Sequence, residues 1–199
     1  MENEKLYDCI VIGAGQSGLA AGYHLQKAGQ TFALLEAQAE LTGSFGRYYD
    51  SLTLFSPVKH SQLPGFALKG LPGHYPTRLE FIQYLQDYRA HFNLPVKLST
   101  AVQQVHKTPE GFSIITPSAT FLSRTVINAT GPFIEPNFPQ YPGQEDFLGE
   151  LMHSVDFRNG DNMEGKRILV VGAGNSAIQI AYELSAKAKV SIASRRKIK

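Results

Sequence analysis

The sequence has one cysteine and no tryptophan among its 199 residues. Cys9 alone cannot form an internal disulfide, a Cys-x-x-Cys redox pair or the ligand set of an iron–sulfur cluster. The apolar run Cys9–Ile12 gives way to glycine well before it reaches the length of a signal peptide or a membrane span. We therefore expect a cytoplasmic protein, in a reducing compartment, that does not associate with membranes.

An excess of charge of either sign is also lacking: 19 Lys and Arg nearly balance 17 Asp and Glu, which gives a formal net charge of +2. Lys and Arg are dense only in the final stretch, residues 194–199, so nucleic acid is not an expected partner. The share of hydrophobic residues, 43%, with 18% charged, is that of a folded globular chain. No metal site is expected, because the histidines share no ligand spacing with nearby carboxylates: His24, His60, His74, His91 and His106.

A glycine fingerprint follows the first apolar run, Tyr7–Ile12. Its glycines suit a tight turn, a close backbone approach to a pyrophosphate and close packing of the next helix on the strand. Helix N-terminal amides then face the phosphates. A second strand, 31–35, ends in Glu36, about 20 residues on, where an acid that binds ribose hydroxyls belongs. We expect dinucleotide contacts from Gly13, Gly15, Gln16, Ser17, Gly18 and Glu36.

The same arrangement recurs after Arg167–Val171. The expected contacts of this second turn are Gly172, Gly174, Asn175 and Ser176. Here the following strand leads to Arg195 and Arg196 instead of a carboxylate. Arginine can hold a 2′-phosphate bidentately, which favours NADPH over NADH. The alternative is that the two arginines are an exposed strand end.

Between the two turns, residues 37–73 read as a long loop region rich in Gly, Pro, Ser and aromatics. A loop of this length is typical of a functional segment, and its run 43–52 is placed to wrap the rest of a cofactor. Thr77 to Glu80 has capping-box spacing and predicts a scaffold helix that ends before Pro95. Short antiparallel strands are then expected at 96–106, 112–116 and 121–122, a returning strand at 124–128, and an irregular connection at 132–165.

These elements predict an α/β fold. Residues 1–145 form an FAD-binding Rossmann-like domain with a β-meander insertion, 146–164 a linker, and 165–199 the first, incomplete βαβ of an NADP-binding domain. The helices are expected at 19–28 and 178–188, and the last strand at 190–194. So small a second sheet cannot bury its apolar side chains alone, so Val170, Val171, Ile178, Ile180 and Ile192 must pack on something else.

Taken together, these residues resemble the class B flavin-dependent monooxygenases. Residues 147–157 fit that family's pattern F-x-G-x-x-x-H-x-x-x-[FY], with His153 at its centre. The ending in Phe157, in place of Trp, is similar to the flavin-containing monooxygenase branch. Ala129-Thr130-Gly131 resembles a segment of the family that passes close to FAD. Residues 49–57 and 75–78 look like segments of bacterial flavoproteins that are related to the plant YUCCA group.

The resemblance implies FAD and NADPH as cofactors, and a small organic substrate that receives one oxygen atom of O2 through an oxygen adduct at the flavin C4a position. It implies a gating or positioning role for His153 and allows a homodimer. The implied FAD contacts are Gly43, Ser44, Phe45, Arg47, Ser56, Val102, Ala129, Thr130 and Gly131. Phe45 stands where the family commonly has Trp, and Ser56 near where animal-type members have Asn.

Three alternative functions stay open. The first is a flavin disulfide reductase, which shares the layout of two dinucleotide sites; the single cysteine of this sequence argues against it, unless the acceptor is a quinone or a dye. The second is a flavin-dependent NAD(P)H oxidoreductase without oxygenation, and the third is an FAD-binding module without turnover. Members of the family continue beyond this length, so we expect an N-terminal fragment that would be inactive by itself.

Overall fold

The computed structural model describes residues 5–131 and 136–196, which form two compact units. The first unit holds most of residues 5–131. The second holds residues 136–196 together with two segments from the first half of the sequence, Arg47–Ser56 and Tyr75–Arg78. The continuous domains expected at 1–145 and 165–199 stay a prediction.

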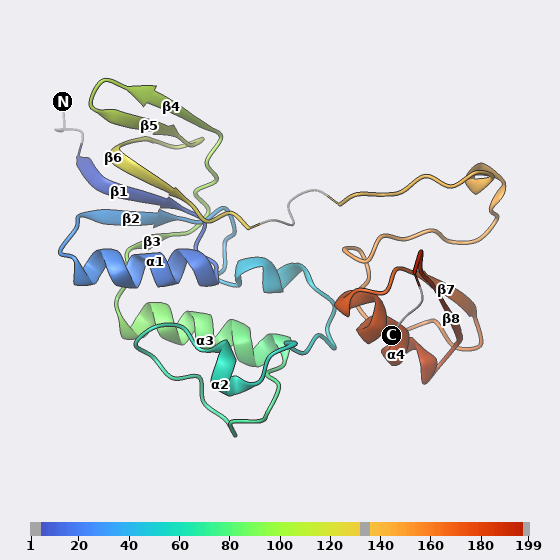
Figure 1. The fold of residues 1–199 in the computed structure, drawn as a ribbon. Helices are drawn as coiled ribbons and strands as arrows, with labels where there is room; N and C mark the ends of the chain where they lie inside the picture. Colours follow the sequence, from blue (N-terminus) through green and yellow to red (C-terminus); the bar gives the residue numbers. More distant parts are fainter. Residues whose placement is uncertain (1–4, 132–135, 197–199) are drawn as a thin grey trace. The chain divides into compact units, whose positions relative to one another are not determined.

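A six-stranded sheet organises the first unit, in the order β3-β2-β1-β6-β5-β4 (Figure 1). Strands β3, β2, β1 and β6 pair in parallel, whereas β6, β5 and β4 pair antiparallel as a meander. The predicted α/β class is thereby confirmed. The strands are β1 (Leu6–Ile12), β2 (Phe32–Leu35), β3 (Val96–Lys97), β4 (Gln104–Thr108), β5 (Gly111–Ile115) and β6 (Thr120–Asn128).

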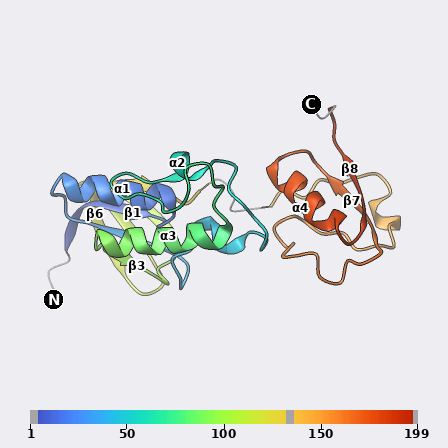
Figure 2. The ribbon, with the colours of Figure 1, turned by 90° about the horizontal axis from the view of Figure 1, so that it is seen from below.

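Helices α1 (Gln16–Lys27) and α3 (Arg78–His91) lie side by side on one face of this sheet (Figures 1 and 2). Gly22 of α1 allows close packing, because a Cβ there would meet a Leu34 methyl at 3.2 Å. On the opposite face, Ile10, Ala33, Leu35 and Ile114 form a buried cluster. All four residues of β2 are buried, as expected of a central parallel strand covered on both faces.

Several element boundaries differ from the sequence prediction. Residues 96–106 are not one antiparallel strand: β3 pairs in parallel with β2, and β4 begins only at Gln104. The two short strands expected at 121–122 and 124–128 are one continuous β6. The loop region 37–73 contains a 3-10 turn, η1 (Gly43–Arg47), and a short helix, α2 (Val58–Ser61).

The second unit contains η2 (Gln144–Asp146), β7 (Arg167–Val171), α4 (Asn175–Ser185) and β8 (Lys189–Ala193), with β7 and β8 parallel. Its core consists of Tyr49, Phe157, Ile180 and Leu184. Of the side chains expected to be buried, Ile180 is buried, but Val171, Ile178 and Ile192 remain 55%, 42% and 38% exposed. Among the described residues, no helix is long and apolar enough to cross a membrane.

Candidate functional site

The carboxyl ends of three parallel strands meet at the first glycine turn. The Gly13 N–H donates to the Leu35 carbonyl at 2.8 Å, and the Ala129 N–H donates to the Ile12 carbonyl at 2.8 Å. These bonds tie together the ends of β2, β1 and β6. Ligands of open α/β sheets bind at this end of the strands. The structure therefore brings the Gly13 turn and the Ala129-Thr130-Gly131 segment into one place.

The three glycines of this turn differ in what a side chain at each position would contact. Gly13 has φ +96°, and a Cβ on it would lie 2.5 Å from the Ala129 carbonyl oxygen. A Cβ on Gly18 would lie 2.0 Å from the Gly13 carbonyl oxygen. A Cβ on Gly15 would meet only the Gly43 Cα, at 3.7 Å. The chain itself thus requires Gly13 and Gly18, whereas the space at Gly15 is open to a ligand.

Gln16 and Ser17 form the first turn of α1, whose N-cap is Gly15, and no side chain caps this end. The first amides of a helix have no partners within the helix, and they carry its partial positive charge. This end of α1 thus offers free donors beside the open space at Gly15. The helix begins three residues earlier than the sequence pattern indicated, because the glycine turn leads directly into it.

Glu36 is held in place by backbone amides. It is 6% exposed, and its carboxylate accepts hydrogen bonds from the Ala14 N–H at 2.8 Å and the Gln38 N–H at 3.0 Å. Each carboxylate oxygen has lone pairs left for a further donor. The geometry thus suits the predicted ribose acid, and it fixes that acid directly to the glycine turn.

Gln38 and Thr42, which the sequence did not indicate as site residues, hold the loop after Glu36 against Gly15. The Gln38 side chain donates to the Gly43 carbonyl at 3.0 Å and accepts from the Thr42 hydroxyl at 2.9 Å. These bonds hold Gly43, at φ +54°, with its Cα against the glycine turn. Gln38 and Thr42 stand outside any fingerprint, so only their bonds in the folded loop reveal them.

The other expected flavin contacts are more dispersed. Ser44 is exposed, and Phe45 packs edge-on against Phe81 with ring centroids 4.8 Å apart. Val102 packs against the buried cluster around Ile10. Arg47 and Ser56 belong to the second unit.

The second glycine turn repeats the open geometry of the first. Gly172 has φ +125°, and its N–H donates to the Ala193 carbonyl at 2.8 Å, which links the ends of β7 and β8. A Cβ on Gly174 would meet nothing within 4 Å. Asn175 and Ser176 begin α4, and Arg195 and Arg196 follow β8 as exposed side chains. The arrangement leaves room for a second dinucleotide.

His153 caps a turn. Its Nδ1 accepts from the Val155 N–H at 3.1 Å, its carbonyl accepts from the Asp156 N–H at 2.9 Å, and its ring lies 5.9 Å from that of Phe138. The two hydrogen bonds are local to the turn, and the gating role stays a prediction. No group of His, Cys, Asp and Glu among the described residues has an arrangement that could hold a metal ion.

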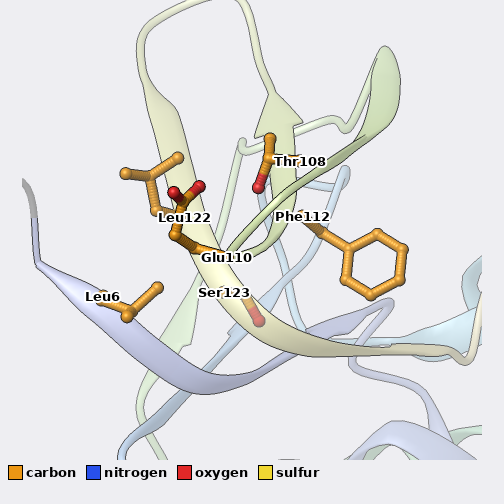
Figure 3. A pocket seen from close by; sticks show the side chains of 6 residues that line it. All are labelled: Leu6, Thr108, Glu110, Phe112, Leu122 and Ser123. Atoms are coloured by element: carbon orange, nitrogen blue, oxygen red, sulfur yellow. The ribbon is translucent and has the colours of Figure 1, made fainter.

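An apolar pocket of about 210 Å³ lies elsewhere in the first unit, lined by Leu6, Thr108, Glu110, Phe112, Leu122 and Ser123 (Figure 3). Leu6 begins β1, so this pocket is at the opposite end of that strand from Gly13. Ligand sites of such sheets lie at the carboxyl ends of the strands. We therefore do not assign the pocket to the cofactors.

Residues 10–199 match the protein family described as "Pyridine nucleotide-disulphide oxidoreductase". The chain is 38% identical over 194 residues to the uncharacterized oxidoreductase CzcO of Bacillus subtilis, covering 97% of this chain and 56% of that protein. It is 34% identical to the probable indole-3-pyruvate monooxygenase YUCCA3 of Arabidopsis thaliana, covering 88% of this chain and 43% of that protein. The chain thus spans about half the length of the curated relatives it matches.

Among solved structures, the flavin-containing monooxygenase from Stenotrophomonas maltophilia superposes with a TM-score of 0.92 at 36% identity. The match covers 97% of this chain and 59% of that one. The resemblance to flavin-containing monooxygenases and to YUCCA proteins, inferred from the motifs, is thereby confirmed. The chain belongs to the pyridine nucleotide-disulphide oxidoreductase family and is similar to flavin monooxygenases.

Proposed function

We propose that the protein is an FAD- and NADPH-dependent monooxygenase that inserts one atom of O2 into a small organic substrate. The observation that carries this proposal is the open space at Gly15, flanked by the amide-anchored carboxylate of Glu36. Similarity to a flavin-containing monooxygenase at 36% identity supports the same class of reaction.

FAD fits the first turn. The pyrophosphate would lie over Gly15 at the N-terminus of α1, where free amides and the helix dipole favour an anion. Glu36 would accept hydrogen bonds from the ribose hydroxyls, and Gly43 would close the loop above the turn. When bound, the flavin supplies the redox and oxygen chemistry, so this chain's residues bind and orient it.

NADPH fits the second turn for a parallel reason. Gly174 leaves space for a pyrophosphate, and the first amides of α4 face it. Arg195 and Arg196 are exposed after β8, where they can reach a 2′-phosphate. Charge-assisted bonds to phosphate stabilise binding by about 1.5 to 3 kcal/mol each.

The test measures reduction of the flavin by NADPH and its reoxidation by oxygen, in the whole protein loaded with FAD. NADPH added without oxygen is expected to bleach the flavin absorbance. Oxygen admitted in the presence of an organic thioether is then expected to yield the sulfoxide, detected by mass spectrometry. Flavin that NADPH does not reduce would refute the proposed coenzyme role.

A second candidate is an oxidoreductase that reduces an acceptor without oxygenation, since the matched family is named for pyridine nucleotide–disulphide chemistry. Within this chain, dithiol chemistry lacks its residues: Cys9 is the single cysteine and is 2% exposed. In the same experiment this candidate gives hydrogen peroxide on reoxidation and no sulfoxide, and that result would replace our proposal.

A further inference from the structure

Asn128 ends β6 beside the first glycine turn. It pairs with Ile12, the last residue of β1, so it lies at the carboxyl end of the parallel strands. The Ala129 N–H that follows donates to the Ile12 carbonyl at 2.8 Å. The next amide nitrogen, that of Thr130, would lie 3.2 Å from a Cβ on Gly13. The chain thus passes from Asn128 directly onto the glycine turn.

The side chain of Asn128 is oriented by Thr130. Its Oδ1 accepts hydrogen bonds from the Thr130 N–H at 3.2 Å and from the Thr130 hydroxyl at 2.9 Å. A backbone N–H can only donate, so the atom that faces it is the amide oxygen, and Nδ2 is the other arm of the carboxamide. No residue that the structure describes accepts a hydrogen bond from Nδ2, and Asn128 is exposed. The carboxamide therefore presents two N–H donors beside the turn.

The residues after Asn128 have already used their own donors. Thr130, one of the expected FAD contacts, gives both its N–H and its hydroxyl hydrogen to Asn128. Ala129 gives its N–H to the end of β1. Among residues 128–130, the Asn128 carboxamide is thus the side-chain donor that is left for a ligand.

The glycine turn is flanked by groups of opposite hydrogen-bonding character. The strand that leads into it, β1, lies between β2 and β6. On the β2 side, the carboxylate of Glu36 is an acceptor, held by the Ala14 N–H at 2.8 Å. On the β6 side, Asn128 is a donor. Ribose hydroxyls can donate to a carboxylate, whereas phosphate oxygens accept and are bound by asparagine amides. A dinucleotide with its ribose on Glu36 would therefore offer Asn128 its phosphates.

Resting on the proposed function, we propose that Asn128 is a further cofactor-binding residue, whose Nδ2 donates a hydrogen bond to a pyrophosphate oxygen of FAD. The acceptor is charged, so this bond belongs to the stronger class of hydrogen bonds. The two bonds from Thr130 fix the carboxamide before the cofactor arrives, so the side chain loses little freedom on binding.

The test is Asn128→Asp in the whole protein. Aspartate keeps an oxygen that accepts both bonds from Thr130, but it replaces Nδ2 with a second oxygen. Thermal unfolding of the flavin-free protein is therefore expected to match that of the wild type. FAD affinity is measured by flavin fluorescence quenching, and ADP and adenosine are measured as competitors that displace FAD. FAD and ADP are expected to bind at least about 10- to 150-fold more weakly, and adenosine, which has no phosphate, equally well.

Asn93→Asp is the matched control for the added charge. Asn93 is exposed and precedes β3, which runs parallel to β2, so it lies at the end of the sheet opposite to the Gly13 turn. Its FAD affinity is expected to equal that of the wild type. Each ratio of variant to wild-type affinity is also measured in 1 M NaCl, where the Debye length is about 3 Å. A lost hydrogen bond persists in that salt, whereas repulsion through solvent is screened.

Wild-type affinity for FAD and ADP in Asn128→Asp would overturn the role of Asn128. A loss that disappears in 1 M NaCl, an equal loss for adenosine, or an equal loss in Asn93→Asp would overturn it as well. A wild-type protein that binds neither FAD nor ADP would instead refute the proposed dinucleotide site, and the role of Asn128 with it.

Discussion

Replacing Gly15 with valine is expected to remove flavin binding and leave the first unit folded. Gly15 has φ −69°, a value any residue adopts, and an added Cβ would meet only Gly43 at 3.7 Å. The stability cost is that of a poor N-cap residue, about 1 kcal/mol. The valine side chain instead fills the space proposed for the pyrophosphate. An overpacking cost of about 1 to 3 kcal/mol corresponds to at least a 5- to 150-fold loss of FAD affinity.

Gly18→Ala is expected to behave in the opposite way. Its Cβ would lie 2.0 Å from the Gly13 carbonyl oxygen, a backbone atom that cannot move without shifting α1 or the turn. We expect a loss of stability of about 1 to 3 kcal/mol or more, which is present without any flavin. The pair thus distinguishes a glycine required by the ligand from one required by the chain.

The assay measures FAD affinity by flavin fluorescence quenching and thermal stability by circular dichroism in the same samples. Gly73→Val is the control, since a Cβ there meets nothing within 4 Å and the residue is exposed in a loop. Its FAD affinity should equal that of the wild type. Wild-type FAD affinity in a folded Gly15→Val protein would show that the cofactor does not use this turn.

Three further predictions concern other parts of the chain. Changing Arg195 and Arg196 to alanine should reduce the preference for NADPH over NADH, a ratio of dissociation constants, by at least about 10- to 150-fold, the factor that corresponds to one lost charge-assisted bond, and an unchanged ratio would remove them from the 2′-phosphate site. Hydrogen bonds from Thr31 hold the pKa of Asp8 below its ordinary value, so the stability contributed by this carboxylate is present above the unfolded pKa and lost as pH falls through the folded one. Asp8→Asn should therefore lower the melting temperature at neutral pH but not in strong acid; an equal loss at both would contradict this linkage. Leu184→Ala, in the core of the second unit, should cost about 2 to 5 kcal/mol in denaturant unfolding, and a cost near zero would show that this core contributes little.

The sequence predicted the parts of the site that depend on local signals. The run into Gly13, the following helix and the second strand ending in Glu36 each carry their own pattern within a few residues. Their meeting at one end of a parallel sheet then follows from the βαβ connection. The turn at Gly172 was predictable for the same reason.

The remaining features depend on contacts between residues far apart in the sequence. Nothing in the run around Tyr49 indicates that it packs on α4, because Gln179 follows 130 residues later. The two-residue strand β3 has too little pattern to show that it pairs in parallel with β2. Gln38 acts through a side-chain bond to Gly43 that only the folded loop creates.

The identity of the bound flavin is the decisive test of a dinucleotide site at the first glycine turn. The purified protein is incubated with equal amounts of FAD and FMN, freed of unbound flavin and denatured, and the released flavin is identified by chromatography. Glu36 is proposed to bind the adenosine ribose, which FMN lacks, so we expect FAD to be released almost alone. Release of FMN in equal amount, or of no flavin, would contradict a dinucleotide site between Gly13 and Glu36.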